Sequence, residues 1–433
     1  MRAISAIMFY PRGGSSHAAR AFTRGLRRQG VDVSLISGSL PSASPHADAV
    51  RFYGPDVQAV DFSPAMASGD PIRYDGPPLH PSYEDRPGAP DRVFASLDDL
   101  AYERQVRAWG QELAHAHAAQ ADVLHLHHLT PINEAAERVA PHVPVVGHLH
   151  GTELLMLENI AAGAQWPYAE RWAARMRAWA RRCARLIVVP AGVQRALDLL
   201  EVERERIIPL PNGVDIDVFD RRPIDRTAVW RCAAPGVDAA ATILLYVGRF
   251  TAVKRLDRLI EAYARARRQT DNPAALVLVG GHPDEVEGEH PTAIAKRLKA
   301  PDVFLAGWQD HTALPDFLCA ADAVVMSSER EQFGQVLVEG MACGLPAVAW
   351  DMLGPASIID DGQTGWLVEP GCQEAFADAL TRVIDDPDER VRRGRRARSA
   401  ARERFSWEGI TVQLADVLEQ VVSREHHAPA LGA

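Results

Sequence analysis

Two carboxylates in one short segment, Glu331 and Glu339, have the spacing to bind two parts of one ligand. Gly334 lies between them, just before residues with a helical pattern, and a glycine there lets a ligand approach the backbone closely. The amino end of a helix offers free N–H groups and a partial positive charge, which suit a diphosphate. At a rise of about 1.5 Å per residue, the two carboxylates are separated by roughly the distance from a ribose to a sugar on that diphosphate.

His125, His127 and His128 form a second group of side chains that can do chemistry. Three imidazoles so close in sequence suggest a metal centre. Neighbouring residues at a strand end point to opposite faces, however, and no carboxylate lies at ligand spacing, so we expect no metal site here. Contact of His127 or His128 with a bound acceptor is a better explanation than a metal site, and packing of the imidazoles in the core is the alternative.

The elements that must position these residues alternate between short apolar runs and helical patterns, which predicts βαβ units and parallel sheets. In the first such unit we expect a strand over 3–9, a turn over 11–16 and a helix over 17–29. The segment 328–346 follows another strand-like run. It should therefore lie at the carboxyl end of a parallel sheet, where open α/β sheets bind ligands.

The alternation is interrupted twice, and the interruptions divide the chain. We expect an N-terminal domain over 1–215, a linker over 216–241, a C-terminal domain over 242–405 and a final amphipathic helix over 406–423 that packs back on the first domain. Residues 40–90 contain ten prolines and are expected to form a long irregular excursion rather than a domain. A structured functional loop and a disordered decoration are both open interpretations of it.

Composition limits the class of protein. The 433 residues are 47% hydrophobic and 24% charged, with a formal net charge of −10, so neutralising nucleic-acid phosphates is not the expected task. The five cysteines are scattered and odd in number, which favours reduced thiols. The N-terminus lacks a signal-peptide pattern and no apolar run approaches the roughly 20 residues of a membrane span, so a cytoplasmic location is expected.

The arginine-rich stretch over 170–185 is expected to form an amphipathic helix with Trp172, Met176 and Trp179 interleaved. A basic helix of this kind can lie on an anionic membrane surface. A helix that packs its tryptophan side inward and solvates its arginines is the favoured interpretation. Peripheral membrane contact is thus possible but not favoured, and the oligomeric state is left open.

The whole flank of the two glutamates is distinctive, because Phe333 and Gly334 precede the run Met341-Ala342-Cys343-Gly344-Leu345-Pro346. This pattern resembles the signature of family 4 glycosyltransferases. The resemblance implies the α/β GT-B fold, with two Rossmann-like doubly wound domains, a cleft between them and a C-terminal helix that crosses back. It also implies retaining transfer of a hexose or aminohexose from a nucleotide diphosphate sugar, UDP favoured over GDP, to a hydroxyl of a small polar acceptor, with no cofactor or metal required.

The same resemblance assigns roles to individual residues. Arg249 and Lys254 match the pair of cations on the donor diphosphate, and residues 211–215 match an interdomain turn. His150 matches a histidine that contacts the donor hexose, whereas His148, two residues earlier, is expected to point to the other side. The expected catalytic residues are Glu331 and His150; the donor-binding residues are Gly14, Arg249, Lys254, Phe333, Gly334, Gln335, Val336 and Glu339; the acceptor-binding residues are Ser16, His127, His128 and Glu153.

Three positions depart from the family pattern: Gln332 where proline is common, Gly340 where alanine is common, and Ser357 where an acid is expected. They leave the identity of the donor sugar open. Two other enzyme functions remain as alternatives, namely a GT-B-fold nucleotide-sugar epimerase and a glycosyltransferase acting on a lipid-linked acceptor at a membrane surface. A subunit that binds sugar nucleotides without turnover is a third, which the intact Glu331, Glu339, Arg249 and Lys254 disfavour.

Overall fold

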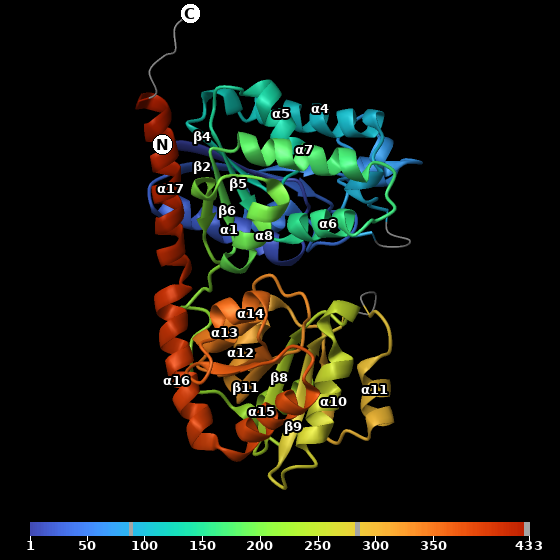
Figure 1. Ribbon diagram of the computed structural model, residues 1–433, viewed down its shortest axis with the longest axis vertical. Coiled ribbons are helices and arrows are strands. Elements are labelled where there is room, and N and C mark those ends of the chain that lie inside the picture. Colours follow the sequence, from blue (N-terminus) through green and yellow to red (C-terminus); the bar gives the residue numbers. More distant parts are fainter. Residues whose placement is uncertain (86–89, 282–285, 428–433) are drawn as a thin grey trace, which may run out of the picture. The chain divides into compact units, whose positions relative to one another are not determined.

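The computed structural model describes residues 1–85, 90–281 and 286–427. The chain divides into two compact units, one made of Met1–Pro211 together with the chain from Ile410 onward, and the other made of Asn212–Gly409. Each unit contains its own sheet and helices (Figure 1). No helix among the described residues is both long and apolar enough to cross a membrane.

The first unit is built on one parallel sheet of seven strands in the order β3-β2-β1-β4-β5-β6-β7. The strands are β1 (Arg2–Ile7), β2 (Asp32–Ser39), β3 (Val57–Asp61), β4 (Val123–His127), β5 (Val145–Leu149), β6 (Arg185–Val188) and β7 (Ile207–Pro209). The chain runs outward from β1 to β3 and then returns to β4 on the other side of β1. This reversal places the open crevice of the sheet at the carboxyl ends of β1 and β4.

The helices of the first unit follow the strands. They are α1 (Gly13–Arg28), α2 (Ala49–Tyr53), α3 (Ser63–Met66), α4 (Asp99–His115), α5 (Pro131–Val139), α6 (Thr152–Ala161), α7 (Ala169–Arg182), α8 (Val193–Leu200) and, in the main, α17 (Trp407–His427). Short 3₁₀ turns are η1 (Pro71–Arg73), η2 (Phe94–Ser96), η3 (Ala118–Gln120), η4 (Pro190–Gly192) and η5 (Arg204–Arg206). From Ile410 onward, α17 packs on this unit, where Thr411 touches Gly25 of α1 so closely that a Cβ there would lie 2.3 Å from its methyl carbon.

The proline-rich stretch after residue 40 is more regular than expected. It contains α2, β3 and α3, and β3 pairs in parallel with β2 along five residues at the edge of the sheet. Val60 and Phe62 are buried in the core of the unit. The expectation of an irregular excursion was wrong here because one short edge strand needs few apolar residues, and the prolines fall outside it.

The second unit is a parallel sheet of six strands in the order β10-β9-β8-β11-β12-β13. The strands are β8 (Thr242–Gly248), β9 (Ala274–Gly280), β10 (Val303–Gly307), β11 (Ala323–Met326), β12 (Ala347–Trp350) and β13 (Gly365–Val368). Its helices are α9 (Arg226–Ala233), α10 (Leu256–Ala266), α11 (Pro291–Leu298), α12 (Leu314–Ala320), α13 (Gln335–Ala342), α14 (Leu353–Ile358), α15 (Gln373–Asp385) and α16 (Pro387–Arg404), with 3₁₀ turns η6 (Ala252–Lys254) and η7 (His311–Ala313). Its strand order reverses between β8 and β11.

Residues 216–241, expected to be a linker, lie inside the second unit. They include α9, whose Trp230 is fully buried and donates its indole N–H to the carbonyl of Ala320, at 3.2 Å. The segment therefore covers α12 rather than joining two units. Arg226, paired with Asp322 at 2.8 Å, attaches it as well, and the weak periodicity around these residues gave no signal of that packing.

The arginine-rich helix α7 turns its apolar side inward, because Trp172, Met176 and Trp179 are buried. Its arginines are paired with carboxylates of neighbouring elements. Arg171 and Arg175 pair with Asp99, Arg177 and Arg181 with Glu201, and Arg182 with Glu137. This arrangement agrees with the favoured interpretation of a packed surface helix.

Candidate active site

The donor-binding residues expected in the second unit gather at the carboxyl ends of β8 and β11. Arg249 follows β8 directly, Lys254 ends η6, and Glu331 lies in the loop after β11. The Lys254 ammonium Nζ lies 2.6 Å from Oε2 of Glu331, and only about a fifth of each side chain is exposed (21% and 17%). The sheet order reverses at these two strands, so a cation and a carboxylate meet where an α/β sheet binds its ligands.

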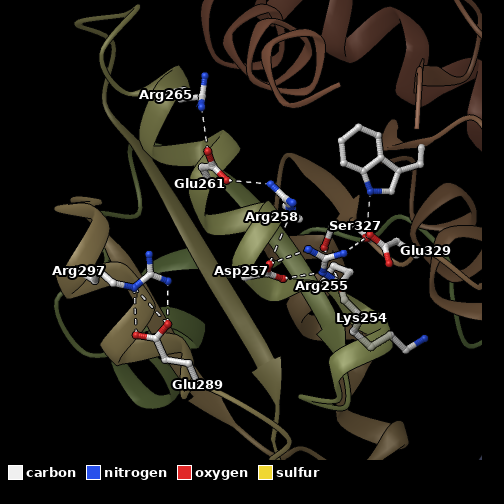
Figure 2. A network of polar contacts seen from close by, with 11 residues as sticks. Lys254, Arg255, Asp257, Arg258, Glu261, Arg265, Glu289, Arg297, Ser327 and Glu329 are labelled. Carbon is white, nitrogen blue, oxygen red and sulfur yellow. Dashed lines mark hydrogen bonds and ion pairs between the residues drawn. The ribbon is translucent and has the colours of Figure 1, made fainter. Parts of the chain in front are cut away.

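The backbone around Lys254 is fixed to the loop after β11. Ser327 donates its hydroxyl to the carbonyl oxygen of Lys254 at 2.8 Å, and Arg255 bridges Asp257 and Glu329, as Figure 2 shows. Hydrogen bonding to Asp257 raises the pKa of the Arg255 guanidinium. Arg255 and Ser327 were not among the predicted site residues, since contacts between segments more than 70 residues apart leave no local signal.

Arg249 is held through its backbone, while its side chain is exposed. The hydroxyl of Tyr246, which is buried inside β8, donates to the carbonyl oxygen of Arg249 at 2.8 Å. Burial, and then the negative charge of Glu331, raises the pKa of Tyr246 above its ordinary value. The phenol therefore stays protonated and remains a donor at neutral pH.

The loop between the two glutamates ends at Gly334, which has a φ of 102° and precedes the first residue of α13. This left-handed conformation favours glycine and turns the chain so that the N–H groups of Gln335 and Val336 begin a helix. The loop is pressed against Gly354, whose N–H donates to the carbonyl of Glu331 at 3.0 Å. A Cβ on Gly354 would lie 2.1 Å from the carbonyl oxygen of Phe333, so only glycine fits there.

Glu339 lies inside α13 and is 2% exposed. Its Oε1 is 2.8 Å from Nε2 of His311, which is about one third exposed and lies in η7. His311 is a functional candidate that the sequence did not reveal, because nothing in its surroundings marks it as the partner of a buried carboxylate. On the same helix, the Gln335 amide donates to the carbonyl of Gly213 at 2.8 Å and so attaches the start of this unit to α13.

The glycine inside α13 has a packing reason. A Cβ at Gly340 would lie 2.9 Å from Cγ1 of Val324 in β11, closer than side chains normally approach. The glycine lets α13 lie near the sheet, and this closeness offsets the roughly 1 kcal/mol that a glycine costs in a helix. The other unusual residue, Ser357, donates its hydroxyl to the carbonyl of Gly354 at 2.7 Å.

In the first unit, the expected turn over 11–16 is shorter than predicted, because α1 already begins at Gly13. Gly14 lies in its first turn, where a Cβ would meet no atom within 4 Å, so local packing does not require the glycine. Ser16 is fully buried, and its hydroxyl accepts from the N–H of Arg12 at 3.2 Å. The Ser16 hydroxyl is therefore not exposed, and it does not reach a bound acceptor as predicted.

The other four residues expected in the first unit are brought together at the ends of β4 and β5. Nδ1 of His127 lies 3.0 Å from Nε2 of His150. The fully buried Glu153 pairs with His128 and accepts from the N–H of Gly151 at 2.9 Å. His127, His128, His150 and Glu153 thus form one connected group.

His148 belongs to the same group, which contradicts the expectation that it points away. Its ring stacks on that of His150 with the centroids 4.8 Å apart and the planes 1° from parallel. Residues two apart on an extended strand share a face, and the expectation reversed that rule. For the same reason His125 and His127, two apart on β4, have ring centroids only 4.5 Å apart, so the imidazoles converge rather than diverge.

Burial decides the charge of these histidines. It lowers the pKa of His125 to about 4 and holds the pKa of His127, His148 and His150 well below the ordinary range, with neighbouring imidazoles lowering the last three further. They are therefore neutral at neutral pH. A neutral imidazole both donates and accepts a hydrogen bond, which suits contact with a sugar hydroxyl.

Comparison with known protein families accounts for most of the chain. Residues 12–218 match the model described as Glycosyltransferase Family 4, and residues 234–400 match the model described as Glycosyl transferases group 1. The chain belongs to glycosyltransferase family 4. This family 4 glycosyltransferase has the two-domain α/β architecture of the GT-B fold, as the residues around Glu331 and Glu339 predicted.

Two curated relatives show how far the similarity extends. N-acetyl-alpha-D-glucosaminyl L-malate synthase of Bacillus anthracis is 27% identical over 314 residues, which cover 70% of this glycosyltransferase and 75% of the relative. D-inositol 3-phosphate glycosyltransferase of Kribbella flavida is 39% identical over 207 residues, or 46% and 47% of the two chains. The second alignment spans about half the length of either protein.

Solved structures share the fold along almost the whole length. Sucrose-phosphate synthase from Thermosynechococcus elongatus superposes with a TM-score of 0.75 at 21% identity, covering 98% of this glycosyltransferase and all of that chain. HepE of Anabaena, solved in complex with UDP and glucose, superposes with a TM-score of 0.69 at 20% identity and covers 97% and 100%. At these identities the similarity establishes the fold alone.

Proposed function

We propose that this family 4 glycosyltransferase transfers a hexose or aminohexose from a UDP-sugar to a hydroxyl of a small polar acceptor, with retention of the anomeric configuration. The observation that carries the proposal is the contact between Lys254 and Glu331 beside the amino end of α13. A diphosphate at that helix end would meet free backbone N–H groups and two cations, Arg249 and Lys254. The donor sugar would then lie next to the Glu331 carboxylate.

Each group of the second unit has a distinct task in this mechanism. The N–H groups of residues 334–336, Arg249 and Lys254 stabilise the negative charge that grows on the leaving diphosphate as the glycosidic bond breaks. Glu339, oriented by His311 at 2.8 Å, binds the ribose hydroxyls. Glu331 orients the hydroxyls of the sugar and stabilises its oxocarbenium-like charge. The leaving phosphate oxygen accepts the proton of the acceptor hydroxyl, which attacks from the face that the phosphate leaves, so configuration is retained.

The first unit supplies the contacts to the sugar and the acceptor. His150 is neutral and half-buried, and its Nε2 contacts His127, so its orientation toward a sugar hydroxyl is fixed. The open backbone at Gly14 is the group proposed to meet the diphosphate, whereas His127, His128 and Glu153 are as fully buried as Ser16 and hold His150 in place rather than exposing a group to the acceptor. The acceptors in the names of the two relatives, L-malate and inositol 3-phosphate, are small and polar, which supports an acceptor of that class here.

The test is a nucleotide-release assay with UDP- and GDP-sugars over a panel of cyclitol phosphates, hydroxy acids and aminosugars. We expect Glu331→Ala to abolish transfer while changing UDP affinity by less than about threefold, since Glu331 faces the sugar and not the nucleotide. Arg249→Ala should weaken both UDP binding and transfer. The anomeric proton coupling of the product reports retention.

Several outcomes would contradict the proposal. Turnover by Glu331→Ala within about threefold of the unchanged enzyme would remove its assigned role. Conversion of the donor sugar to its epimer in the absence of any acceptor would indicate a nucleotide-sugar epimerase. Transfer confined to lipid-linked acceptors in vesicles would replace the small acceptor by a membrane-bound one.

A further inference from the structure

Five histidines converge at the carboxyl ends of β4 and β5, and the proposed transfer uses only some of them. His127, His128 and His150 have proposed roles toward the substrates, whereas His125 and His148 have none, although both are as fully buried as His127. Polar side chains are seldom buried without a partner that compensates for the lost water. His125 and His148 contact each other through one nitrogen each, but the second ring nitrogen of each has no partner among the described residues, and this needs an explanation.

His125, His127 and His148 lie close enough together that small ring rotations would make them a set of metal ligands. One ring nitrogen from each of His125, His127 and His148 lies within 4.8 Å of those of the other two. Nε2 of His125 and Nδ1 of His148 are 3.1 Å apart. Two nitrogens that each lie about 2.0–2.1 Å from one tetrahedral ion would be roughly 3.3 Å apart, so this pair already has the separation of two zinc ligands.

The strands fix this geometry. β4 pairs in parallel with β5, and the register places His127 opposite His148 and His125 opposite Val146. All three residues are thus held by the hydrogen-bonded ladder of two central strands and not by loops. A site on such rigid elements can keep its ligands in place before an ion arrives.

Several ring nitrogens of the cluster still lack a partner. Within the part of the chain that the structure describes, Nδ1 of His125, Nε2 of His127 and Nε2 of His148 are buried without a hydrogen-bond partner. A buried nitrogen left in this state is destabilising, and coordination of an ion removes that cost wherever one of these nitrogens is a ligand. Small rotations of the three rings choose which nitrogen of each faces the ion.

We propose that His125, His127 and His148 bind one divalent transition-metal ion, with Zn²⁺ as the best match. Three imidazole nitrogens and no carboxylate suit zinc, cobalt, nickel or copper and do not suit Mg²⁺ or Ca²⁺, which take oxygen ligands. Because His127 contacts His150, the ion would act as a positioning element that fixes His127 and, through it, His150. Only this last step rests on the proposed transfer; metal binding itself does not.

The binding test uses the full-length, tag-free protein after dialysis against a chelator. Titration with Co²⁺ should give a visible absorption band of tetrahedral type that saturates at one ion per chain, and Zn²⁺ should displace it. Zn²⁺ should also raise the melting temperature, whereas Mg²⁺ should leave both signals unchanged. No band at saturating Co²⁺ would overturn the proposal and leave a hydrogen-bonded imidazole cluster as the explanation.

Variants separate this site from adventitious binding. His148→Gln and His125→Gln should each weaken Co²⁺ binding at least about tenfold and abolish the band, because a tetrahedral site loses one of its few ligands. His142→Gln is the matched control and should bind like the unchanged protein, since His142 is an exposed histidine of the same unit whose Nε2 lies 3.0 Å from the carbonyl oxygen of Ala119, outside the cluster. Circular dichroism identifies any variant that fails to fold, and the second variant then decides. Equal binding by a folded variant and the control would overturn the assignment.

Discussion

Lys254 and Glu331 neutralise each other in the second unit, and a bound sugar nucleotide has to share this pair. With four fifths of each side chain covered, the 2.6 Å contact holds the ammonium beside the carboxylate and near the helix end. A diphosphate offers Lys254 a second anion without removing the first. In the proposed mechanism, the same contact brings the cation for the leaving group within hydrogen-bond distance of the carboxylate for the sugar.

His311 is the residue-scale feature whose role is easiest to isolate. Replacing it with alanine leaves the buried carboxylate of Glu339 without its 2.8 Å partner, so the carboxylate is less well oriented for the ribose contact proposed above. We expect His311→Ala to weaken UDP binding about tenfold or more, the effect of losing one hydrogen bond to a charged group. Calorimetric titration with UDP measures it.

The split between binding and turnover distinguishes this role from a general loss of structure. His311→Ala should raise the KM for the donor and leave kcat within about threefold, because the lost interaction is made equally in the ground and transition states. His311→Gln, which keeps a donor of similar reach, should recover most of the affinity. Unchanged UDP affinity in the alanine variant would show that Glu339 does not depend on His311.

The limits of prediction at this scale follow from sequence distance. Glu331 and Glu339 could be recognised because the pattern around them is local. His311 lies 28 residues from Glu339 and Lys254 lies 77 from Glu331, so their contacts exist only after the sheet has formed. The wrong prediction for His148 had another origin. Residues two apart on a strand share a face, so His148 and His150 should have been expected on the same side.

At the scale of elements, the distance between α13 and β11 is set by a missing side chain. Alanine at position 340 would place a Cβ 2.9 Å from Val324 and push the helix, with Glu339 and Gly334, away from the sheet. The gain in helix propensity is about 1 kcal/mol and overpacking costs about 1–3 kcal/mol, so Gly340→Ala should lower the free energy of unfolding by up to about 2 kcal/mol. Urea denaturation of the full chain measures the change.

Gly110 is the matched control for this substitution. It also lies inside a helix, α4, but its Cβ would meet only Val139, at an ordinary 3.5 Å. Gly110→Ala should therefore stabilise the protein by about 0.5–1 kcal/mol. If both substitutions raised the urea midpoint alike, close packing could not be the reason for the glycine in α13.

The order of strands and helices in both units was predictable, because alternating apolar runs and helical patterns are the signal of parallel α/β sheets. The packing of the short elements β3 and α9 against their neighbours could not be predicted. The strand β3 and the helix α9 are each recognised by one or two buried residues, Val60 and Trp230, in surroundings full of prolines. Such elements form because a neighbouring edge or groove receives them, and a local pattern does not describe that neighbour.

At the scale of the molecule, the boundary between the two units lies between Pro211 and Asn212, earlier than the sequence predicted. The turn over 211–215 was expected to end the first domain, yet from Asn212 it belongs to the second unit. Val214 donates its N–H to the carbonyl of Phe405 at 2.7 Å, and Trp407 donates its N–H to the carbonyl of Val214 at 3.2 Å. A Cβ on Gly213 would lie 2.6 Å from the indole of Trp407, so these two segments of the second unit are packed together.

The last helix completes the core of the first unit, although it comes from the other end of the sequence. Leu414 and Leu418 of α17 are fully buried, one turn apart, and lie in the first unit. Replacing either with alanine should lower the free energy of unfolding of that unit by about 2–5 kcal/mol, the usual cost of an emptied leucine site. Hydrogen exchange with mass spectrometry checks this unit by unit: protection should fall in β1 and α1 and stay unchanged in β8 and α13.

Val412→Ala on the same helix is the control. The Val412 side chain is 40% exposed, so this substitution should change the free energy of unfolding by less than about 0.5 kcal/mol. Loss of protection in the second unit alone would mean that α17 contributes to a different core from the one described.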